Sequence, residues 1–181
     1  MVCLLMLVYA GMEIGLASWI PTYAIKAGVA TTEESTFYSQ LYWVPSCIGR
    51  LAWIYAPGGM ATRIAVIMKL MVGVGTVSLL LQTLGQYEAV CLFSPVASGL
   101  LLSNVYLFYL SLAVDHGFEA SSNSTAHIML ANALGEGVIN MPTGYLIRNF
   151  SFQVLMVLQV LFAVLSSWTM SQLHTRLDRE L

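Results

Sequence analysis

Charged residues are scarce in this chain. Of its 181 residues, 9% are Asp, Glu, Lys or Arg, and 58% are hydrophobic. A soluble domain averages about 25% charged residues and somewhat less than half apolar residues. Together with a mean hydropathy of +0.77, this composition argues against an ordinary soluble domain. It indicates a membrane protein whose main surroundings are the lipid bilayer.

The chain also lacks runs of basic residues and paired cysteines. Its formal net charge is −2, and no cluster of Lys and Arg could bind the phosphates of a nucleic acid. Cys3, Cys47 and Cys91 lie in apolar segments, without CxxC spacing and without a neighbouring histidine. Zinc and thiol chemistry need such neighbours. We therefore expect no nucleic-acid partner and no metal centre.

Catalytic patterns are missing as well. No nucleophile is flanked as in a nucleophile elbow, and no carboxylate pair is placed for hydrolysis. The glycines of GEG and PGG do not follow a strand and precede a helix, as a phosphate-binding loop requires. The sequence therefore predicts neither an enzyme nor a bound cofactor.

Long apolar runs are what the chain does have. About 20 apolar residues are needed to cross a hydrocarbon core of about 30 Å. Short polar connections separate the runs, so consecutive helices should be antiparallel neighbours. We expect an all-α, polytopic membrane protein that forms a single domain over residues 1–181. Its six transmembrane helices are predicted at about 2–25, 37–56, 64–84, 89–114, 125–147 and 152–170.

The positive residues favour an inside N-terminus, because Lys and Arg concentrate in cytoplasmic loops. In that orientation four arginines lie at inside ends and two basic residues at outside ends. The chain enters apolar sequence directly after Met1, and this abrupt start predicts that a segment upstream is missing. The inside residues are Arg50, Arg63, Arg176 and Arg179, and the outside ones are Lys26 and Arg148.

Two carboxylates fall inside predicted spans. A charge near the centre of a bilayer costs about 2.5–3.5 kcal/mol on insertion scales, so Glu13 and Glu136 need an explanation. At about 100° per helical residue, Asn132, Asn140 and Thr143 share one narrow face with Glu136. Other residues of this face offer amides and hydroxyls, which suit a polar solute. The alternative is that these groups only form hydrogen bonds between helices and stabilise the bundle.

Other polar residues form faces too. On the first span, Tyr9, Glu13, Ile20 and Tyr23 lie opposite a stripe of small residues that begins with Gly11 and Gly15 and permits close helix packing. Spans three and six are apolar almost all round. We expect spans one, two, four and five to converge on one cavity, with three and six outside, in a 3+3 arrangement typical of transporter repeats. The second and fourth spans contribute Gln40, Trp43, Arg50 and Asn104.

Three segments resemble a known transporter family. Residues 9–24, YAGMEIGLASWIPTYA, are similar to the seventh-helix signature of a major facilitator superfamily branch that includes sodium-dependent glucose transporters and fucose permeases. The matching positions are Glu13–Gly15, Trp19 and Tyr23–Ala24. The pair Gly49–Arg50 resembles the GR of helix eight, and GEGVINMPTGY at 135–145 resembles the Gly-Glu…Pro…Gly segment of helix eleven.

The resemblance implies that the chain is the C-terminal six-helix half of a twelve-helix transporter. Its partner would be the N-terminal half of the same transporter, and transport would proceed by alternating access. The implied substrate is a sugar or a similar small polar solute, with Na⁺ or H⁺ as a possible coupling ion. We place it in the plasma membrane rather than an organelle. The candidate substrate-binding residues are Glu136, Asn132, Asn140, Gln40, Trp43, Asn104, Glu13, Trp19 and Tyr23.

Two alternatives stay open from the sequence. Glu13 could brace its helix against Arg50 instead of contacting a ligand. The whole chain could also be a membrane scaffold or fragment that does not transport and acts only by helix–helix association. An intramembrane enzyme or a channel would need converging catalytic groups or a symmetrical ring of pore residues, and the sequence shows neither.

Overall fold

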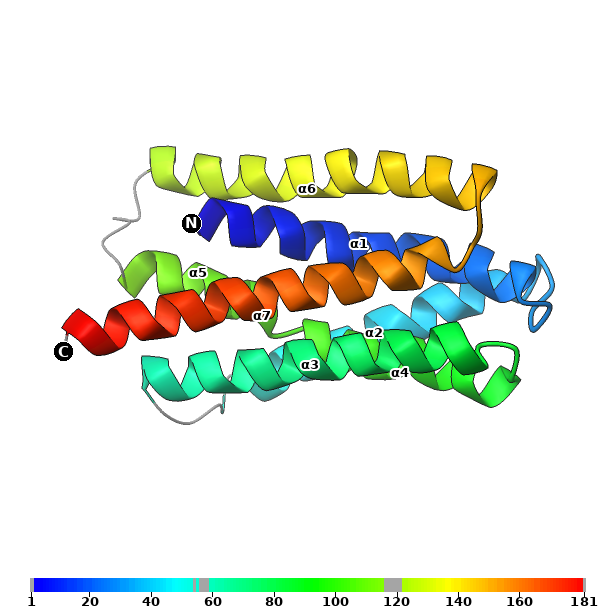
Figure 1. The fold of residues 1–181 in the computed structure, drawn as a ribbon, viewed down its shortest axis with the longest axis horizontal. Coiled ribbons are helices and arrows are strands. Elements are labelled where there is room, and N and C mark those ends of the chain that lie inside the picture. Colours follow the sequence, from blue (N-terminus) through cyan, green and yellow to red (C-terminus); the bar gives the residue numbers. More distant parts are fainter. Residues whose placement is uncertain (1, 54, 56–58, 116–121, 181) are drawn as a thin grey trace.

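The computed structural model describes residues 2–53, 55, 59–115 and 122–180, and all regular structure in these segments is helical (Figure 1). The predicted connections at 57–63 and 115–124 lie partly outside the described residues. Connections elsewhere are short, as expected. The helices are α1 (Val2–Lys26), α2 (Ser35–Trp53), α3 (Met60–Leu84), α4 (Glu88–Leu102), α5 (Val105–Asp115), α6 (Ser122–Asn149) and α7 (Val154–Glu180).

Four stretches of the described chain are long and apolar enough to cross a membrane. They are Cys3–Lys26, Thr62–Leu84, Glu88–Tyr109 and Val154–Gln172. The helices α2 and α6 are not among them, because Arg50 and several hydroxyls dilute α2, and α6 carries the polar face around Glu136. The predicted all-α class is thus confirmed for the described residues, and four stretches fit the predicted membrane protein in length and composition. A count of six spans stays a prediction.

The fourth predicted span is divided into two helices. α4 ends at Leu102 and α5 begins at Val105, with a turn at Ser103 and Asn104. The Ser103 hydroxyl donates to the Leu100 carbonyl at 2.7 Å. Short polar side chains compete in this way for backbone groups and weaken a helix locally. Neither proline nor glycine marks the break, so the apolar pattern concealed it.

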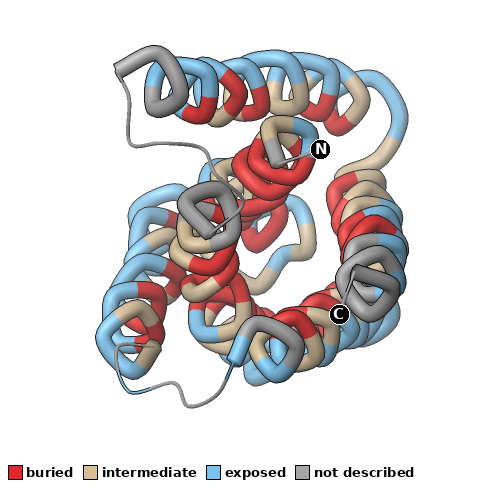
Figure 2. The backbone as a smooth tube through the Cα atoms, turned by 90° about the vertical axis from the view of Figure 1, so that its left-hand side faces the viewer, coloured by how far each residue is buried: buried red, intermediate tan, exposed pale blue. Residues whose placement is uncertain are grey.

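The helix α1 occupies the middle of the bundle (Figures 1 and 2). It packs chiefly against α6 and α2, and also against α7 and α5. Its spanning stretch is 67% buried, against 39% for that of α3 and 33% for that of α7. The two helices predicted to be apolar all round are therefore the more peripheral ones, and they pack against each other.

α1 and α6 run in the same direction and approach closely. A Cβ atom added at Gly135 would meet the backbone carbonyl of Leu7, and one added at Gly11 would meet the side chain of Ile139. Further along, the ring of Trp19 lies against Gly144. Small residues let helix backbones come together in a membrane. The predicted contact face of small residues is therefore present at Gly11.

The connection between α1 and α2 turns at Gly28, whose φ of 76° is a conformation that favours glycine. After it, the Glu34 carboxylate accepts hydrogen bonds from the Thr31 amide and the Thr31 hydroxyl, both at 2.9 Å. The backbone bond and then the hydroxyl bond lower the pKa of Glu34 below its ordinary value. The ionised form is the one that holds this turn.

This turn should loosen in acid. A group whose pKa is lowered in the folded state stabilises above its ordinary pKa and ceases to do so as the pH falls through the lowered value. We expect the Thr31 amide to exchange its hydrogen faster, relative to its intrinsic rate, once Glu34 is protonated. Hydrogen exchange followed by mass spectrometry would measure this. In Glu34→Gln the pH step should be absent, and its persistence there would contradict the assignment.

Candidate functional site

A buried ion pair links α1 to α2. The Arg50 guanidinium donates from Nη2 to Glu13 Oε1 at 2.7 Å, and the Glu13 side chain is 9% exposed while that of Arg50 is 40% exposed. Glu13 lies near the middle of α1, and Arg50 lies in the last turn of α2. The pair explains how a carboxylate is tolerated inside a spanning helix, since its charge is balanced by a direct partner.

Tyrosines surround this pair. Tyr9 and Tyr42 are buried and interact electrostatically with Glu13. The ring of Tyr109 on α5 meets that of Tyr9 edge to face, with ring centroids 6.1 Å apart. The Tyr9 hydroxyl interacts with both side chains of the pair, and that of Tyr109 interacts with Ser166. The Tyr42 hydroxyl is buried without a hydrogen-bond partner among the described residues. Buried polar atoms are normally paired, so this hydroxyl marks a place where water or a solute would fit.

The polar face of α6 is built by bonds one turn apart. Asn132 donates from Nδ2 to Glu136 Oε1 at 2.7 Å, and Asn140 donates from Nδ2 to the Glu136 carbonyl at 2.7 Å. Thr143 donates to the Ile139 carbonyl at 2.7 Å. The shared face predicted from helical geometry is thus present. Asn132, Glu136 and Asn140 are all partly exposed, so the face is accessible.

α6 and α7 meet α1 at Gly15. A Cβ atom there would lie 3.0 Å from Asn140 Oδ1 and 3.7 Å from Gln159 Nε2. Gln159 donates from Nε2 to the Met12 carbonyl at 3.0 Å. The remaining acceptors, Asn140 Oδ1 and Gln159 Oε1, are buried without partners among the described residues. Both side chains that lie against Gly15 therefore carry an unpaired oxygen.

Glu136 acts electrostatically on Glu13, although less strongly than Tyr9 and Arg50 do. Glu13 is paired with the positively charged Arg50, whereas Glu136 accepts a hydrogen bond from the neutral side-chain amide of Asn132. An amide carries no net charge, so it cannot compensate the negative charge that an ionised Glu136 would add. Binding of a proton or a small cation would relieve the repulsion. Among the described residues, no group of three or more His, Cys, Asp or Glu side chains is arranged to hold a metal ion.

The remaining predicted site residues are distributed more widely. Trp19 packs on α6 at Gly144, with its indole nitrogen buried and unpaired among the described residues. Tyr23 lies at the far end of α1, where its hydroxyl donates to the Leu81 carbonyl at 2.6 Å. Gln40 and Trp43 are exposed on α2, and Asn104 lies in the turn between α4 and α5. The structure shows no direct contact of these residues with Glu136.

Arg50, Tyr42 and Gln159 belong to the site but were not among its predicted residues. Arg50 was judged an inside-end charge, although its shared face with Gln40 and Trp43 gave a signal. Gln159 is a polar residue on an otherwise apolar helix, which is itself a signal in a membrane span. No sequence signal marked Tyr42, because a tyrosine within an apolar run cannot be distinguished from an ordinary core residue.

The comparisons with known proteins add no relative. No protein-family model, no curated protein and no solved structure matches this chain.

Proposed function

We propose that the chain is the C-terminal half of a secondary active transporter in the plasma membrane. The proposed substrate is a small polar solute, specifically a sugar. The observation that supports this most is the buried Glu13–Arg50 ion pair, because Glu13 lies in a stretch that could span a membrane and Glu136 acts on it electrostatically. Ionisable groups at such depth are costly and usually mark a solute or ion pathway. The unpaired Tyr42 hydroxyl and the unpaired amide oxygens of Asn140 and Gln159 provide a donor and acceptors for sugar hydroxyls.

Glu136 is the proposed coupling group. A proton or Na⁺ bound there would remove the repulsion between Glu136 and Glu13, and this favours a conformation that brings the two carboxylates together. Release of the ion would favour a conformation that separates them or admits water. A ligand shifts a conformational equilibrium only by its different affinities for the two states, and the repulsion between the two carboxylates would supply that difference. Alternating access by rocking against the N-terminal half would then couple ion to solute.

Uptake by the full-length transporter tests this function directly. Cells that express it would be given a panel of labelled sugars, with and without a sodium gradient and with and without a pH gradient. We expect uptake of at least one sugar to depend on one of the gradients. Failure of every sugar would reject the substrate class, and uptake independent of both gradients would reject ion coupling.

Replacing Glu136 by Gln should abolish the ion dependence of uptake. The amide keeps the size of the side chain but cannot ionise, so we expect gradient-driven uptake to fall at least tenfold while the protein reaches the membrane in normal amount. The control is Glu33→Gln, which changes an exposed carboxylate before α2. Unchanged uptake and ion dependence in Glu136→Gln would remove this residue from the proposal.

A scaffold role by helix–helix association is the alternative. The close α1–α6 packing at Gly11 and Gly135 is compatible with it but does not favour it, because transporters pack their helices in the same way. A scaffold would tolerate Glu136→Gln and would show no uptake of any solute. The uptake measurements above therefore distinguish the two.

A further inference from the structure

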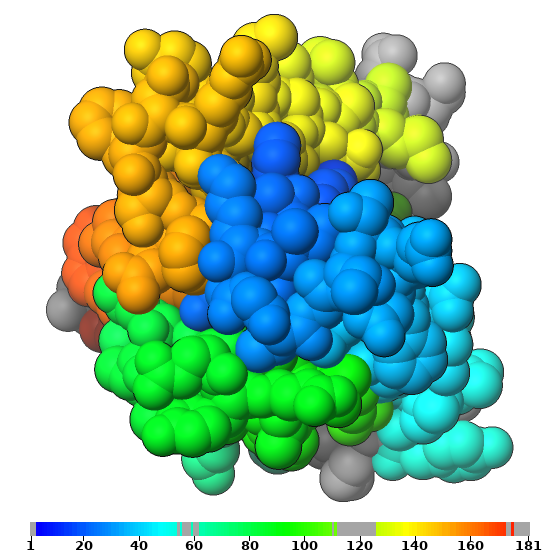
Figure 3. Space-filling view, turned by 90° about the vertical axis from the view of Figure 1, so that its right-hand side faces the viewer, coloured from blue at the N-terminus to red at the C-terminus, as the bar shows by residue number. Residues whose placement is uncertain are grey.

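A polar cavity lies at the end of the bundle where α1, α3 and the connection before α7 meet. It has a volume of about 260 Å³ and is lined by Tyr23, Lys26, Gln82, Gln86 and Gln153 among others. Figure 3 shows this end of the molecule. These residues offer an ammonium group and several amide donors, with no carboxylate among the residues that line the cavity. Such a donor set suits a phosphate.

The walls of this cavity are held in place. Tyr23 donates from its hydroxyl to the Leu81 carbonyl at 2.6 Å and meets the ring of Phe152 at a centroid distance of 5.1 Å. Lys26 donates from Nζ to the Ile147 carbonyl at 3.2 Å. This single bond leaves two further ammonium donors, and Lys26 is exposed. The ammonium is therefore both positioned and free to bind an anion.

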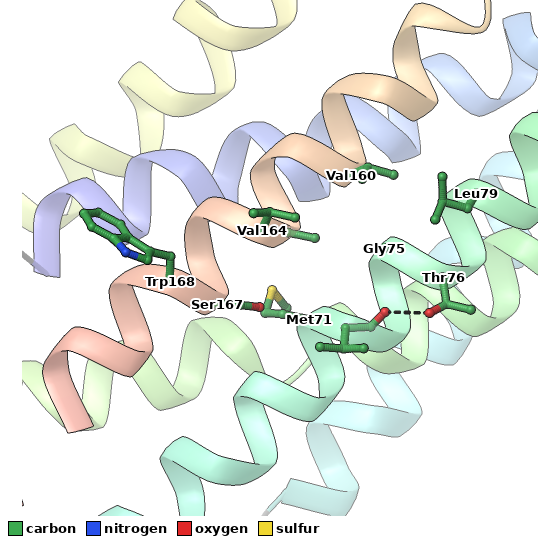
Figure 4. Close-up of a pocket in the computed structure, with 10 residues that line it drawn as sticks. Met71, Gly75, Thr76, Leu79, Val160, Val164, Ser167 and Trp168 are labelled. Carbon is green, nitrogen blue, oxygen red and sulfur yellow. Dashed lines mark hydrogen bonds between the residues drawn. The ribbon is translucent and has the colours of Figure 1, made fainter. Parts of the chain in front are cut away.

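An apolar groove runs along the seam between α3 and α7 (Figure 4). It has a volume of about 500 Å³. In Figure 4, Val160 and Val164 of α7 lie across the groove from Gly75 and Thr76 of α3. The helices approach at Gly75, where an added Cβ atom would lie 3.7 Å from the Ala163 methyl group. The Thr76 hydroxyl is turned back onto the Val72 carbonyl at 2.9 Å, which leaves the groove wall apolar.

The cavity and the groove occupy one face of α3. Lining residues follow the helix at intervals of three and four, and this spacing keeps them on the same side. Ten residues separate Val72 from Gln82, a rise of about 15 Å. A second apolar hollow of about 440 Å³ continues the same face toward Lys69. The lining residues of α3 that share this face are Ala65, Met68, Lys69, Val72, Gly75, Thr76, Leu79, Gln82 and Thr83, and Met71 lines the groove from one side of it.

We propose that this face binds one glycerophospholipid, with its phosphate in the polar cavity and an acyl chain in the groove. The order of the parts matches the ligand: a cationic, amide-rich end at the terminus of a membrane span, then an apolar channel along the helix pair. Both α3 and α7 contain stretches long and apolar enough to cross a membrane, and both are largely exposed. Lys26 at the end of its span lies where headgroups are found. An anionic lipid should bind more tightly than a zwitterionic one, because its headgroup places no positive charge near Lys26.

Lipid titration of the purified full-length protein in detergent, followed by native mass spectrometry, tests the site. The probes are phosphatidylglycerol, phosphatidylcholine and diacylglycerol with the same acyl chains, and inorganic phosphate. We expect phosphatidylglycerol to bind most tightly and diacylglycerol, which lacks the phosphate, to bind least. Equal binding of diacylglycerol would overturn the proposal. Displacement of the lipid by equimolar inorganic phosphate would show a site for the free anion instead.

Lys26→Gln should weaken phosphatidylglycerol binding about fivefold, the effect of one basic group near a membrane surface. Lys69→Gln is the matched control, because it removes a charge from the same face at the other end of the groove. An unchanged affinity in Lys26→Gln, or an equal loss in Lys69→Gln, would overturn the headgroup assignment.

The groove has its own matched pair of variants on α7. Val164→Trp adds bulk within the groove, whereas Leu165→Trp adds the same bulk at an exposed neighbour outside it. Both changes are at exposed positions, so neither should prevent folding. We expect Val164→Trp to weaken binding of the lipid without affecting binding of inorganic phosphate. Leu165→Trp should leave both unchanged. Equal affinity in the two variants would overturn the placement of the acyl chain.

Discussion

Replacing Arg50 by methionine is expected to destabilise the protein by about 3 kcal/mol. Arg50 is the direct partner of Glu13, whose side chain is 9% exposed. Removing one member of a buried pair leaves the other charge without compensation, at a typical cost of about 3–5 kcal/mol. We place the effect at the low end of that range, because Arg50 itself is 40% exposed and already partly solvated.

Glu136 should make the destabilisation larger than it would be for an isolated ion pair. Glu136 repels Glu13 electrostatically, and Arg50 is the counter-charge bonded to Glu13. In Arg50→Met the charge of Glu13 would lose its counter-charge while Glu136 still acts on it. Replacing both partners, as in Glu13→Leu with Arg50→Met, should recover much of the lost stability because no unpaired charge remains.

Thermal unfolding in detergent, with and without the double replacement, measures these effects. Arg148→Met is the matched control, since Arg148 is exposed in the last turn of α6. We expect Arg50→Met to unfold several degrees below the parent protein, and the double variant to lie between them. A double variant less stable than Arg50→Met alone would show that the residues stabilise by packing and not by charge pairing.

Gly135→Ala is expected to destabilise the α1–α6 contact by about 1–3 kcal/mol, the usual cost of overpacking. The added methyl group would meet the backbone carbonyl of Leu7. A backbone carbonyl cannot rotate away as a side chain can, so the two helices must separate. The neighbouring variant Gly137→Ala adds the same methyl group where no atom lies within 4 Å.

These two variants form a control pair on one helix. Alanine favours a helix over glycine by about 1 kcal/mol, and this gain applies to both positions. We therefore expect Gly137→Ala to be neutral or slightly stabilising, and Gly135→Ala to unfold at a lower temperature in the same detergent. Equal unfolding temperatures would contradict the close approach of α6 to α1 at Gly135.

The α6 face shows what could be predicted for the site. Asn132, Glu136 and Asn140 are one turn apart, so helix geometry alone places them together, and the structure joins them through two hydrogen bonds of 2.7 Å. Residues one turn apart on a helix are neighbours in any fold. The same reasoning identified Glu13 as a buried group that needs a partner. It left open whether that partner was a ligand or Arg50.

Contacts between helices could not be predicted in the same way. Tyr23 was assigned to the face of Glu13, yet its hydroxyl reaches Leu81 at the end of α3. Gln159 lies 147 positions after Met12, whose carbonyl it binds. The turn at Ser103 and Asn104 interrupts a long run of mostly apolar residues. Hydropathy reports burial in lipid, and a short polar break within a long apolar run changes it little.

The sequence by itself determined the membrane class, the approximate ends of most helices and the polar faces of α1 and α6. These properties depend on composition and on the helical repeat, which act within one segment. Only the tertiary structure decided that Arg50 neutralises Glu13, that Glu136 acts electrostatically on Glu13, and that α3 and α7 form an apolar groove. Such pairings depend on which helices become neighbours and in what register. That choice depends on close packing at positions such as Gly11, Gly15 and Gly135. The absence of a side chain there permits another helix to approach, but it does not determine which helix that is.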